Sequence, residues 1–341
     1  MKGAATVVRK TIHDIAKISG FSKSTVSRVL MADSRVKPDT RDKIQKIIDE
    51  CHFERNEIAR GMAMGSLRIV MIVAGDIASY FYGVTVKELE KILFGAGYLV
   101  VVCTSEYSAE KELSYLNMAR LYRMSGVVLM TAIESEELIR LIGEADCPVI
   151  LINRYLNSCE LDAVVQDNFQ CAYLATKHLI DMGHRRILHI SSGQGATTSR
   201  DRQAGFLAAL QDAGCPVTPD MVVYGDLTWL SGYGHARVIV ENGRDYTAAF
   251  IGNDMMTVGF VKGWLECGRK IPEDISLICF DPSPFIEQLP VRMSTVGRPA
   301  EDLGVIAGKF LLERLAGSQE PLHRIVLQPL LQIRESVKKI C

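Results

Sequence analysis

From Leu67 onward, apolar runs of strand length alternate with segments of helical periodicity, and this alternation constrains the fold most. Continuous apolar strands between helices indicate parallel sheets that are covered on both faces. The strands are too many for one ordinary sheet, so we expect two similar α/β halves with a break near residue 160. The expected strands are 69–74, 98–103, 126–130, 148–152, 187–191, 221–224, 248–251 and 276–280, and the expected helices include 82–95, 109–124, 168–182, 200–213, 231–242, 255–267 and 299–316.

The residues that precede this region predict a head of three short helices. A tight turn joins the first two, and the third runs from Asp39 or Thr40 to about Cys51. Apolar residues recur at helical spacing on both sides of Gly20, which accepts the left-handed backbone of such a turn. Ser22 is a suitable N-cap for the second helix. The pattern is typical of a helix-turn-helix, whose second helix enters the major groove of DNA. The outer face of that helix would carry Lys23, Ser24, Ser27 and Arg28.

The charge distribution supports a DNA-contacting head on an acidic body. The whole chain has a net charge of -1, but residues 1–60 hold 13 Lys+Arg and 8 Asp+Glu, a net of +5, and the remainder holds 26 minus 32, or -6. A basic head suits phosphate contacts, whereas an acidic body avoids them. We therefore divide the chain into a helix-turn-helix domain at 1–52, a linker at 53–66 and an α/β domain at 67–341.

The cysteines indicate a reducing compartment, which predicts a cytoplasmic protein. The nine cysteines are scattered and form no C-x-x-C pair, which argues against a metal site and against a disulfide framework. The chain also has no apolar run of about 18 residues, so we expect no membrane span.

Polar and aromatic residues follow many of the expected strands, where ligands bind in open α/β sheets. Amides and carboxylates hydrogen-bond hydroxyl groups, and aromatic rings cover the apolar faces of sugars or bases, so this pattern predicts a pocket for a small polar molecule. Asp254 and Asp281 have an alternative interpretation as helix caps. The residues at the strand ends are Asp76, 79–82, Asn153, Arg154, 192–195, Arg202, Asp226, Leu227, Trp229, Asn253, Asp254 and Asp281.

The sequence gives little support to an enzyme. It contains no G-x-x-x-x-G-K-[ST] phosphate loop, no H-E-x-x-H pair and no G-x-S-x-G elbow. The pair Gly193 and Gly195 lacks the third glycine of a dinucleotide fingerprint. We therefore expect no catalytic residue and no cofactor.

Six motifs, taken with this order of elements, resemble the LacI/GalR family of bacterial transcription regulators. The resemblance runs from about Thr11 to Ser336, and the motifs stand in the family's order and at its spacing. They are SKSTVSRVL, RNEIARGM, the GHRRI of 183–187, RQAGFLAAL, NDMMTVG and IPEDISLICFD.

The resemblance implies a homodimer that reads a palindromic operator. In this family a hinge helix inserts a leucine into the minor groove, and here Met62, in the segment 53–66, stands at that place. The residues that the resemblance and the helical pattern together assign to DNA are Lys23, Ser24, Thr25, Ser27, Arg28 and Met62.

The resemblance further implies that residues 67–341 form two discontinuous, doubly wound α/β subdomains of the periplasmic-binding-protein type, with an effector bound between them and with chain crossings near 295 and at the C-terminus. The resemblance implies that the effector is a sugar or sugar derivative and that the protein is a repressor whose binding to DNA this ligand controls. The implied effector-binding residues are Ser79, Phe81, Tyr82, Asn153, Arg202, Leu227, Asn253 and Asp281.

Three alternatives stay open at this point. One is a ligand sensor that does not bind DNA, against which the basic head argues. A second is a regulator that responds to a nucleoside or purine, because the same fold accepts such ligands. The third is a sugar-processing enzyme, against which the absence of a placed nucleophile or acid–base pair argues.

Overall fold

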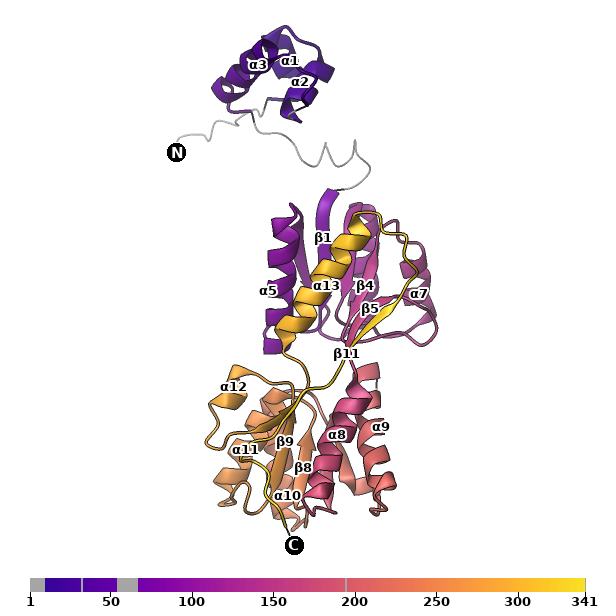
Figure 1. The fold of residues 1–341 in the computed structure, drawn as a ribbon, viewed down its shortest axis with the longest axis vertical. Helices are drawn as coiled ribbons and strands as arrows, with labels where there is room; N and C mark the ends of the chain where they lie inside the picture. Colours follow the sequence, from indigo (N-terminus) through magenta and orange to yellow (C-terminus); the bar gives the residue numbers. More distant parts are fainter. Residues whose placement is uncertain (1–9, 32, 54–66, 194, 341) are drawn as a thin grey trace, which may run out of the picture. The chain divides into compact units, whose positions relative to one another are not determined.

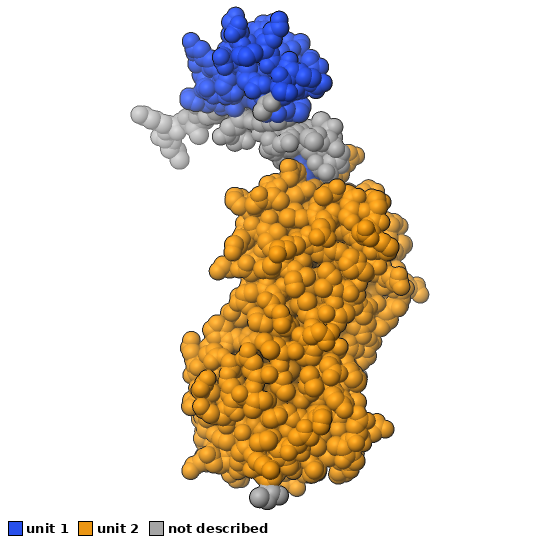
Figure 2. Space-filling model, viewed as in Figure 1, with its two compact units in different colours: residues 1–67 blue, residues 68–341 orange. Residues whose placement is uncertain are grey.

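The computed structural model describes residues 10–31, 33–53, 67–193 and 195–340. The chain divides into two compact units, residues 1–67 and 68–341 (Figure 2). The predicted boundaries at 52 and 66 stay a prediction, because most of the linker lies outside the described residues.

The first unit contains three short helices: α1 (Ile12–Ser19), α2 (Lys23–Leu30) and α3 (Pro38–Glu50). At Gly20 the backbone turns with a φ of 72°, as the tight turn requires. The three helices bury one small core of Ile15, Ala16, Val26, Val29, Val36, Ile44 and Ile48. The helix-turn-helix prediction is therefore confirmed.

The second unit contains two six-stranded sheets, each of which forms the centre of a subdomain (Figure 1). The first sheet has the strand order β11-β5-β4-β3-β1-β2, and the second has the order β12-β10-β9-β8-β6-β7. The two doubly wound α/β halves that the sequence predicts are thus confirmed.

The strands of the first subdomain alternate between two apolar cores. In β1, Val70 and Ile72 face α5 and α13, whereas Met71 and Val73 face α6 and α7. Helices therefore cover both faces, which is why the buried residues on both faces of these strands are mostly apolar. The elements are β1 (Leu67–Ala74), α5 (Tyr80–Gly95), β2 (Leu99–Thr104), α6 (Ala109–Leu121), β3 (Met124–Leu129), α7 (Glu136–Gly143), β4 (Val149–Ile152), β5 (Asp162–Gln166), α13 (Ala300–Leu315) and β11 (Arg324–Leu327).

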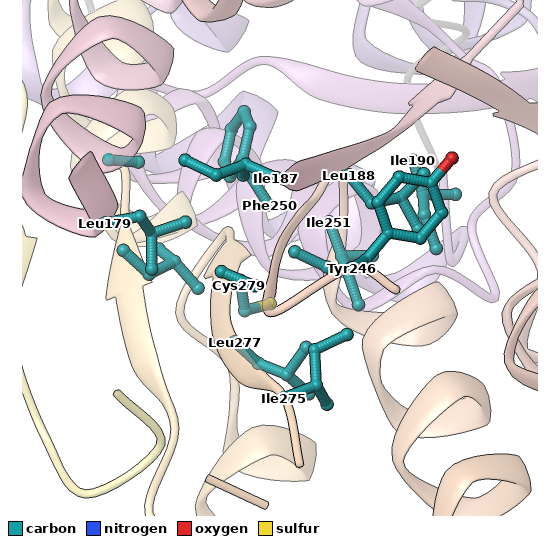
Figure 3. Close-up of a cluster of buried hydrophobic side chains, with 14 of the residues drawn as sticks. Leu179, Ile187, Leu188, Ile190, Tyr246, Phe250, Ile251, Ile275, Leu277 and Cys279 are labelled. Atoms are coloured by element: carbon teal, nitrogen blue, oxygen red, sulfur yellow. The ribbon is translucent and has the colours of Figure 1, made fainter. Parts of the chain in front are cut away.

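The second subdomain has one continuous core on its sheet, part of which Figure 3 shows. Phe206, Phe250, Phe260 and Phe280 are its largest fully buried side chains. The elements are α8 (Asn168–Asp181), β6 (Ile187–Ser192), α9 (Thr197–Asp212), η1 (Pro219–Met221), β7 (Val222–Gly225), α10 (Trp229–Glu241), β8 (Ala248–Ile251), α11 (Asp254–Glu266), β9 (Ser276–Phe280), α12 (Pro284–Glu287), β10 (Ser294–Val296) and β12 (Leu331–Gln332).

The chain passes between the subdomains three times: after β5, between β10 and α13, and between β11 and β12. Strand β5 was not predicted. The unpredicted strand begins with Asp162, a residue that is rare inside strands. Its carboxylate is buried and accepts hydrogen bonds from Arg314 Nε at 2.6 Å and Nη2 at 2.8 Å.

Candidate functional site

A cavity of about 630 Å³ lies between the two subdomains, at the ends of strands from both sheets. The structure places all eight of the predicted effector-binding residues in its lining: Ser79, Phe81, Tyr82, Asn153, Arg202, Leu227, Asn253 and Asp281. They meet because the carboxyl ends of parallel strands share one edge of each sheet, and the two edges face each other. Their role in binding stays a prediction.

Aromatic rings form the wall that the first subdomain contributes. The ring centroids of Phe81 and Tyr82 are 5.5 Å apart, and those of Tyr82 and Tyr107 are 6.4 Å apart. A Cβ atom at Gly75 would lie 2.7 Å from the Tyr107 ring, so this close approach requires glycine. Both Glu106 and Tyr107 have positive φ values, of 50° and 59°. Sequence reasoning missed Tyr107, although it follows strand β2 and the strand-end rule would have found it.

Arg202 is the centre of the polar wall that the second subdomain contributes. Its Nε donates to Asn168 Oδ1 at 2.8 Å, and its Nη1 donates to the Gly252 carbonyl at 2.7 Å. Its guanidinium carbon lies 3.3 Å from the centroid of the Phe280 ring. These contacts fix the guanidinium in one position at the floor of the cavity, before any ligand binds.

The carboxyl group of Asp281 shares this floor with Arg202. Burial raises the pKa of Asp281 to about 6, although the charge of Arg202 acts in the opposite direction. Gln166 Nε2 donates to Asp281 Oδ1 at 3.5 Å, and Gln166 Oε1 accepts from the Arg298 backbone N–H at 2.6 Å. Since Gln166 ends strand β5, this chain of contacts joins the two subdomains beside the cavity.

Asn253 is a helix cap as well as a lining residue. Its Oδ1 accepts from the Met256 backbone N–H at 3.0 Å, and its Nδ2 donates to the Leu227 carbonyl at 2.9 Å. Leu227 itself has a φ of 69°. The N-cap of α11 is therefore Asn253, and not Asp254 as the alternative interpretation of the sequence suggested.

A second set of contacts joins the subdomains near the cavity, and we call Tyr155, Asn157, Arg200 and Asp201 the rim clasp. Tyr155 Oη donates to the two carboxylate oxygens of Asp201 at 3.0 and 2.9 Å. Arg200 Nη2 donates to Tyr155 Oη and to Asn157 Oδ1, each at 3.2 Å. Tyr155 and Asn157 follow β4 in the first subdomain, whereas Arg200 and Asp201 belong to α9 in the second. The rim clasp thus depends on the angle between the subdomains.

In the first unit, α2 presents the side chains that the sequence assigns to DNA. Lys23, Ser24 and Arg28 are exposed, and Thr25 and Ser27 are half-buried. The hydroxyl groups of Ser24 and Thr25 each lie 2.8 Å from Ser22 Oγ, so the cap of the helix also orients them. Met62 lies outside the described residues, and its role stays a prediction.

Comparison with known proteins shows to which family this chain belongs. Residues 11–56 match the model described as bacterial regulatory proteins, lacI family, and residues 176–337 match a periplasmic binding protein-like domain. The HTH-type transcriptional repressor PurR of Edwardsiella ictaluri is 30% identical over 96% of this chain and 96% of its own length. This chain belongs to the lacI family of bacterial regulatory proteins. It is therefore a DNA-binding regulator of transcription, and not an enzyme.

Solved structures of the lacI family share the fold along nearly the whole chain. The complex of the transcriptional regulator CelR with cellobiose is 27% identical, with a TM-score of 0.73, and covers 96% of this chain and 100% of its own. The lac repressor dimer bound to operator and the anti-inducer ONPF has a TM-score of 0.87 at 21% identity, with coverage of 97% and 99%. The second comparison supports the fold alone.

Neither metal binding nor membrane insertion finds support in the described residues. No group of three or more His, Cys, Asp or Glu side chains is gathered there as a metal ion would require. None of the described helices combines the length and the apolar character that a membrane span needs.

Proposed function

We propose that this chain is a homodimeric repressor that binds a palindromic operator and releases or retains it according to a sugar or sugar derivative in the cavity. The observation that carries the proposal is the cavity itself, which is lined from both subdomains and bordered by contacts that join them. An effector that prefers one subdomain angle shifts the population toward that angle. The first subdomain begins with β1 at Leu67, so its rotation reaches the linker 53–66 directly.

Exposed apolar side chains support the dimer. Phe94 and Leu99, at the end of α5 and the start of the edge strand β2, are 69% and 58% exposed, and Leu121 and Tyr122, at the end of α6, are 75% and 61% exposed. Because apolar patches on a protein surface often mark protein–protein interfaces, we propose that these side chains contribute to the dimer contact.

The face of α2 is the proposed reading surface for DNA. Lys23 and Arg28 are exposed cations on one helix, and both side chains reach the acceptor atoms of guanine in a major groove. Met62 and the linker 53–66 are proposed to contact the minor groove, by resemblance to the family.

The first experiment measures operator binding. An operator is selected from random duplexes, and its affinity is measured by fluorescence anisotropy at several salt concentrations. We expect Lys23→Ala and Arg28→Ala to weaken binding by about 1–3 kcal/mol and to relax the base preference. Lys46→Ala is the matched control, because Lys46 is an exposed lysine on α3 with its side chain near Glu50. Wild-type affinity in both α2 variants, or affinity that does not change with salt, contradicts the proposed DNA interface.

A further inference from the structure

Tyr107 is the most exposed of the three aromatic side chains on the first wall of the cavity. It follows β2, and 43% of its surface is exposed, whereas Phe81 is half-buried and only 8% of Tyr82 is exposed. A ligand that covers an exposed ring removes apolar area from water, which is favourable. Tyr107 therefore offers a ligand more uncovered aromatic surface than its two neighbours do.

The backbone of the turn after β2 brings this ring into the cavity. Glu106 and Tyr107 have φ values of 50° and 59°, a left-handed conformation that is uncommon for residues other than glycine. The surrounding contacts hold it: the Glu106 N–H donates to the Gly75 carbonyl at 2.9 Å, and the Tyr107 N–H donates to Ser105 Oγ at 3.3 Å. Strained backbone of this kind is concentrated at ligand-binding sites, where the position of a side chain justifies its cost.

The phenol end of Tyr107 lies over Gly75, directly after β1. A Cβ atom on Gly75 would lie 2.7 Å from Tyr107 Cε1 and 2.8 Å from its Cζ. Burial raises the pKa of the Tyr107 phenol, which agrees with a hydroxyl group that is turned away from water. The part of the side chain that faces the cavity is therefore the ring rather than the hydroxyl group.

The opposite wall presents polar groups to the same space. The second subdomain contributes the guanidinium of Arg202, the amide of Asn253 and the carboxyl group of Asp281. A ligand that contacts both walls must therefore be apolar on one side and polar on the other. A pyranose meets this requirement, because its C–H groups form a face and its hydroxyl groups surround the ring. An acyclic sugar derivative has hydroxyl groups on all sides and loses more conformational freedom when it binds.

We propose that Tyr107 is a specificity-determining residue of this cavity, and that its ring packs on the C–H face of a pyranose, so that the effector is a cyclic sugar and not an acyclic sugar derivative. The hydroxyl groups of the sugar face Arg202 and Asp281. This inference rests on the proposed function, since it names the ring form of the effector and the residue that selects it in the same cavity.

The first test examines the position of the ring and needs no ligand. In the full-length protein, Gly75→Ala places a methyl group against the Tyr107 ring, so we expect the melting temperature to fall by about 2 °C or more. In a Tyr107→Ala background the same substitution should have little effect, because the remaining neighbour, Tyr82 Oη at 2.9 Å, is the end of a side chain that can move. An equal fall in both backgrounds would show that the ring does not lie over Gly75, which overturns the proposal.

The second test compares cyclic and acyclic ligands by isothermal titration calorimetry. The cyclic probes are D-glucose, D-galactose and D-mannose. The acyclic probes are the corresponding alditols, D-glucitol, galactitol and D-mannitol, which have a hydroxyl group on every carbon of an open chain. Adenosine and guanosine form a third set. We expect at least one pyranose to bind at least about tenfold more tightly than its alditol, because the alditol has no C–H face for the ring and more freedom to lose.

Three variants connect this difference to Tyr107. Tyr107→Ala should lower the affinity for the pyranose by at least about tenfold and change the affinity for the alditol by less than about twofold. Tyr107→Phe keeps the ring and should retain the affinity for the pyranose. Tyr224→Ala is the matched control, because Tyr224 is similarly exposed, at 42%, and lies outside the cavity lining. It should change neither affinity.

The outcomes separate this inference from the proposed function. Equal affinities for pyranoses and alditols, or a pyranose affinity that survives Tyr107→Ala, would overturn the role of Tyr107 but leave a sugar-controlled regulator. Binding of nucleosides alone overturns both the pyranose and the sugar class. Binding of none of the pyranoses overturns the inference, whereas operator binding by wild type, Lys23→Ala and Arg28→Ala tests the DNA-binding function independently.

Discussion

The two subdomains contribute opposite walls to the cavity, and the walls differ in how they hold their buried arginines. In the second subdomain, Arg202 is held by Asn168, the Gly252 carbonyl and the Phe280 ring. In the first subdomain, Arg154 is similarly buried but forms no hydrogen bond with the described residues. The second wall is therefore organised by the protein's own contacts before a ligand binds, whereas Arg154 on the first wall has no such contacts with the described residues. Preorganisation of one wall reduces the ordering cost of binding.

The strongest way to break this comparison is to remove the organised arginine. Arg202→Ala leaves Asn168 Oδ1 and the Gly252 carbonyl without their donor and removes the cation beside Asp281. We expect the free energy of unfolding to fall by about 3–5 kcal/mol and the response to effector to be lost, with operator binding retained where the protein stays folded. Urea denaturation and operator titrations measure the two effects.

The matched control for that variant is Arg237→Ala. The Arg237 side chain is 51% exposed and pairs with Glu241 at 3.5 Å on the surface of α10. Its loss should change the free energy of unfolding by less than about 1 kcal/mol. Equal effects of the two substitutions would mean that Arg202 does not organise the wall.

The pH dependence of the free energy of unfolding tests the same wall, because it contains the buried carboxyl group of Asp281. Its pKa in the folded protein is about 6, against an ordinary value of 3.8, so the folded state holds this proton more tightly than the unfolded state. Stability therefore falls as the pH rises from about 4 to about 6, by up to about 3 kcal/mol from this group. Asp281→Asn should remove that part of the pH dependence, as urea denaturation of both proteins at closely spaced pH values would show. Parallel stability curves for the two proteins would count against a buried, proton-binding Asp281.

The smallest expected effect concerns the rim clasp between the walls. Tyr155→Phe removes the hydroxyl that donates to Asp201 across the subdomains. We expect about a fivefold loss of effector affinity, which corresponds to one partly exposed hydrogen bond of about 1 kcal/mol. Tyr173→Phe is the control, because Tyr173 Oη donates to Asp212 within the second subdomain. Calorimetric titration of an identified effector should leave the control unchanged, and an equal loss in both variants would exclude a role for the clasp in closure.

The sequence largely predicted which residues line the cavity, but it did not predict the hydrogen bonds of the two buried arginines. Parallel strands end at a common edge, so residues that follow strands, such as Asn153 and Asp281, can be placed together without knowledge of their contacts. Tyr107 follows the same rule and was overlooked. The hydrogen bonds that distinguish Arg202 from Arg154 depend on Asn168 and Gly252, which are distant in sequence and follow no local pattern.

Strand β5 shows a different limit of sequence reasoning. An aspartate at the start of an apolar run resembles a turn residue, because unpaired carboxylates are seldom buried. Asp162 is tolerated there because Arg314, 152 residues away, reaches it with two hydrogen bonds. Hydrophobic periodicity and strand propensity contain no information about a partner so distant in the sequence. No sequence pattern signals the hydrogen bonds between Asp162 and Arg314, so the predicted break between the two halves lies near residue 160, before β5.

The three chain passages between the subdomains determine when the protein can become complete during synthesis. The sheet that begins with β1 lacks α13, one of its covering helices, until residues 300–315 are present, and it lacks the edge strand β11 until residues 324–327 follow. Leu303, Phe310 and Leu311 belong to the core beneath that helix. When the first half of this chain has been translated, α5 covers only part of one apolar face of this sheet, and the rest of that face is still open to water. The subdomain that is started first can be finished only when nearly the entire polypeptide has been made.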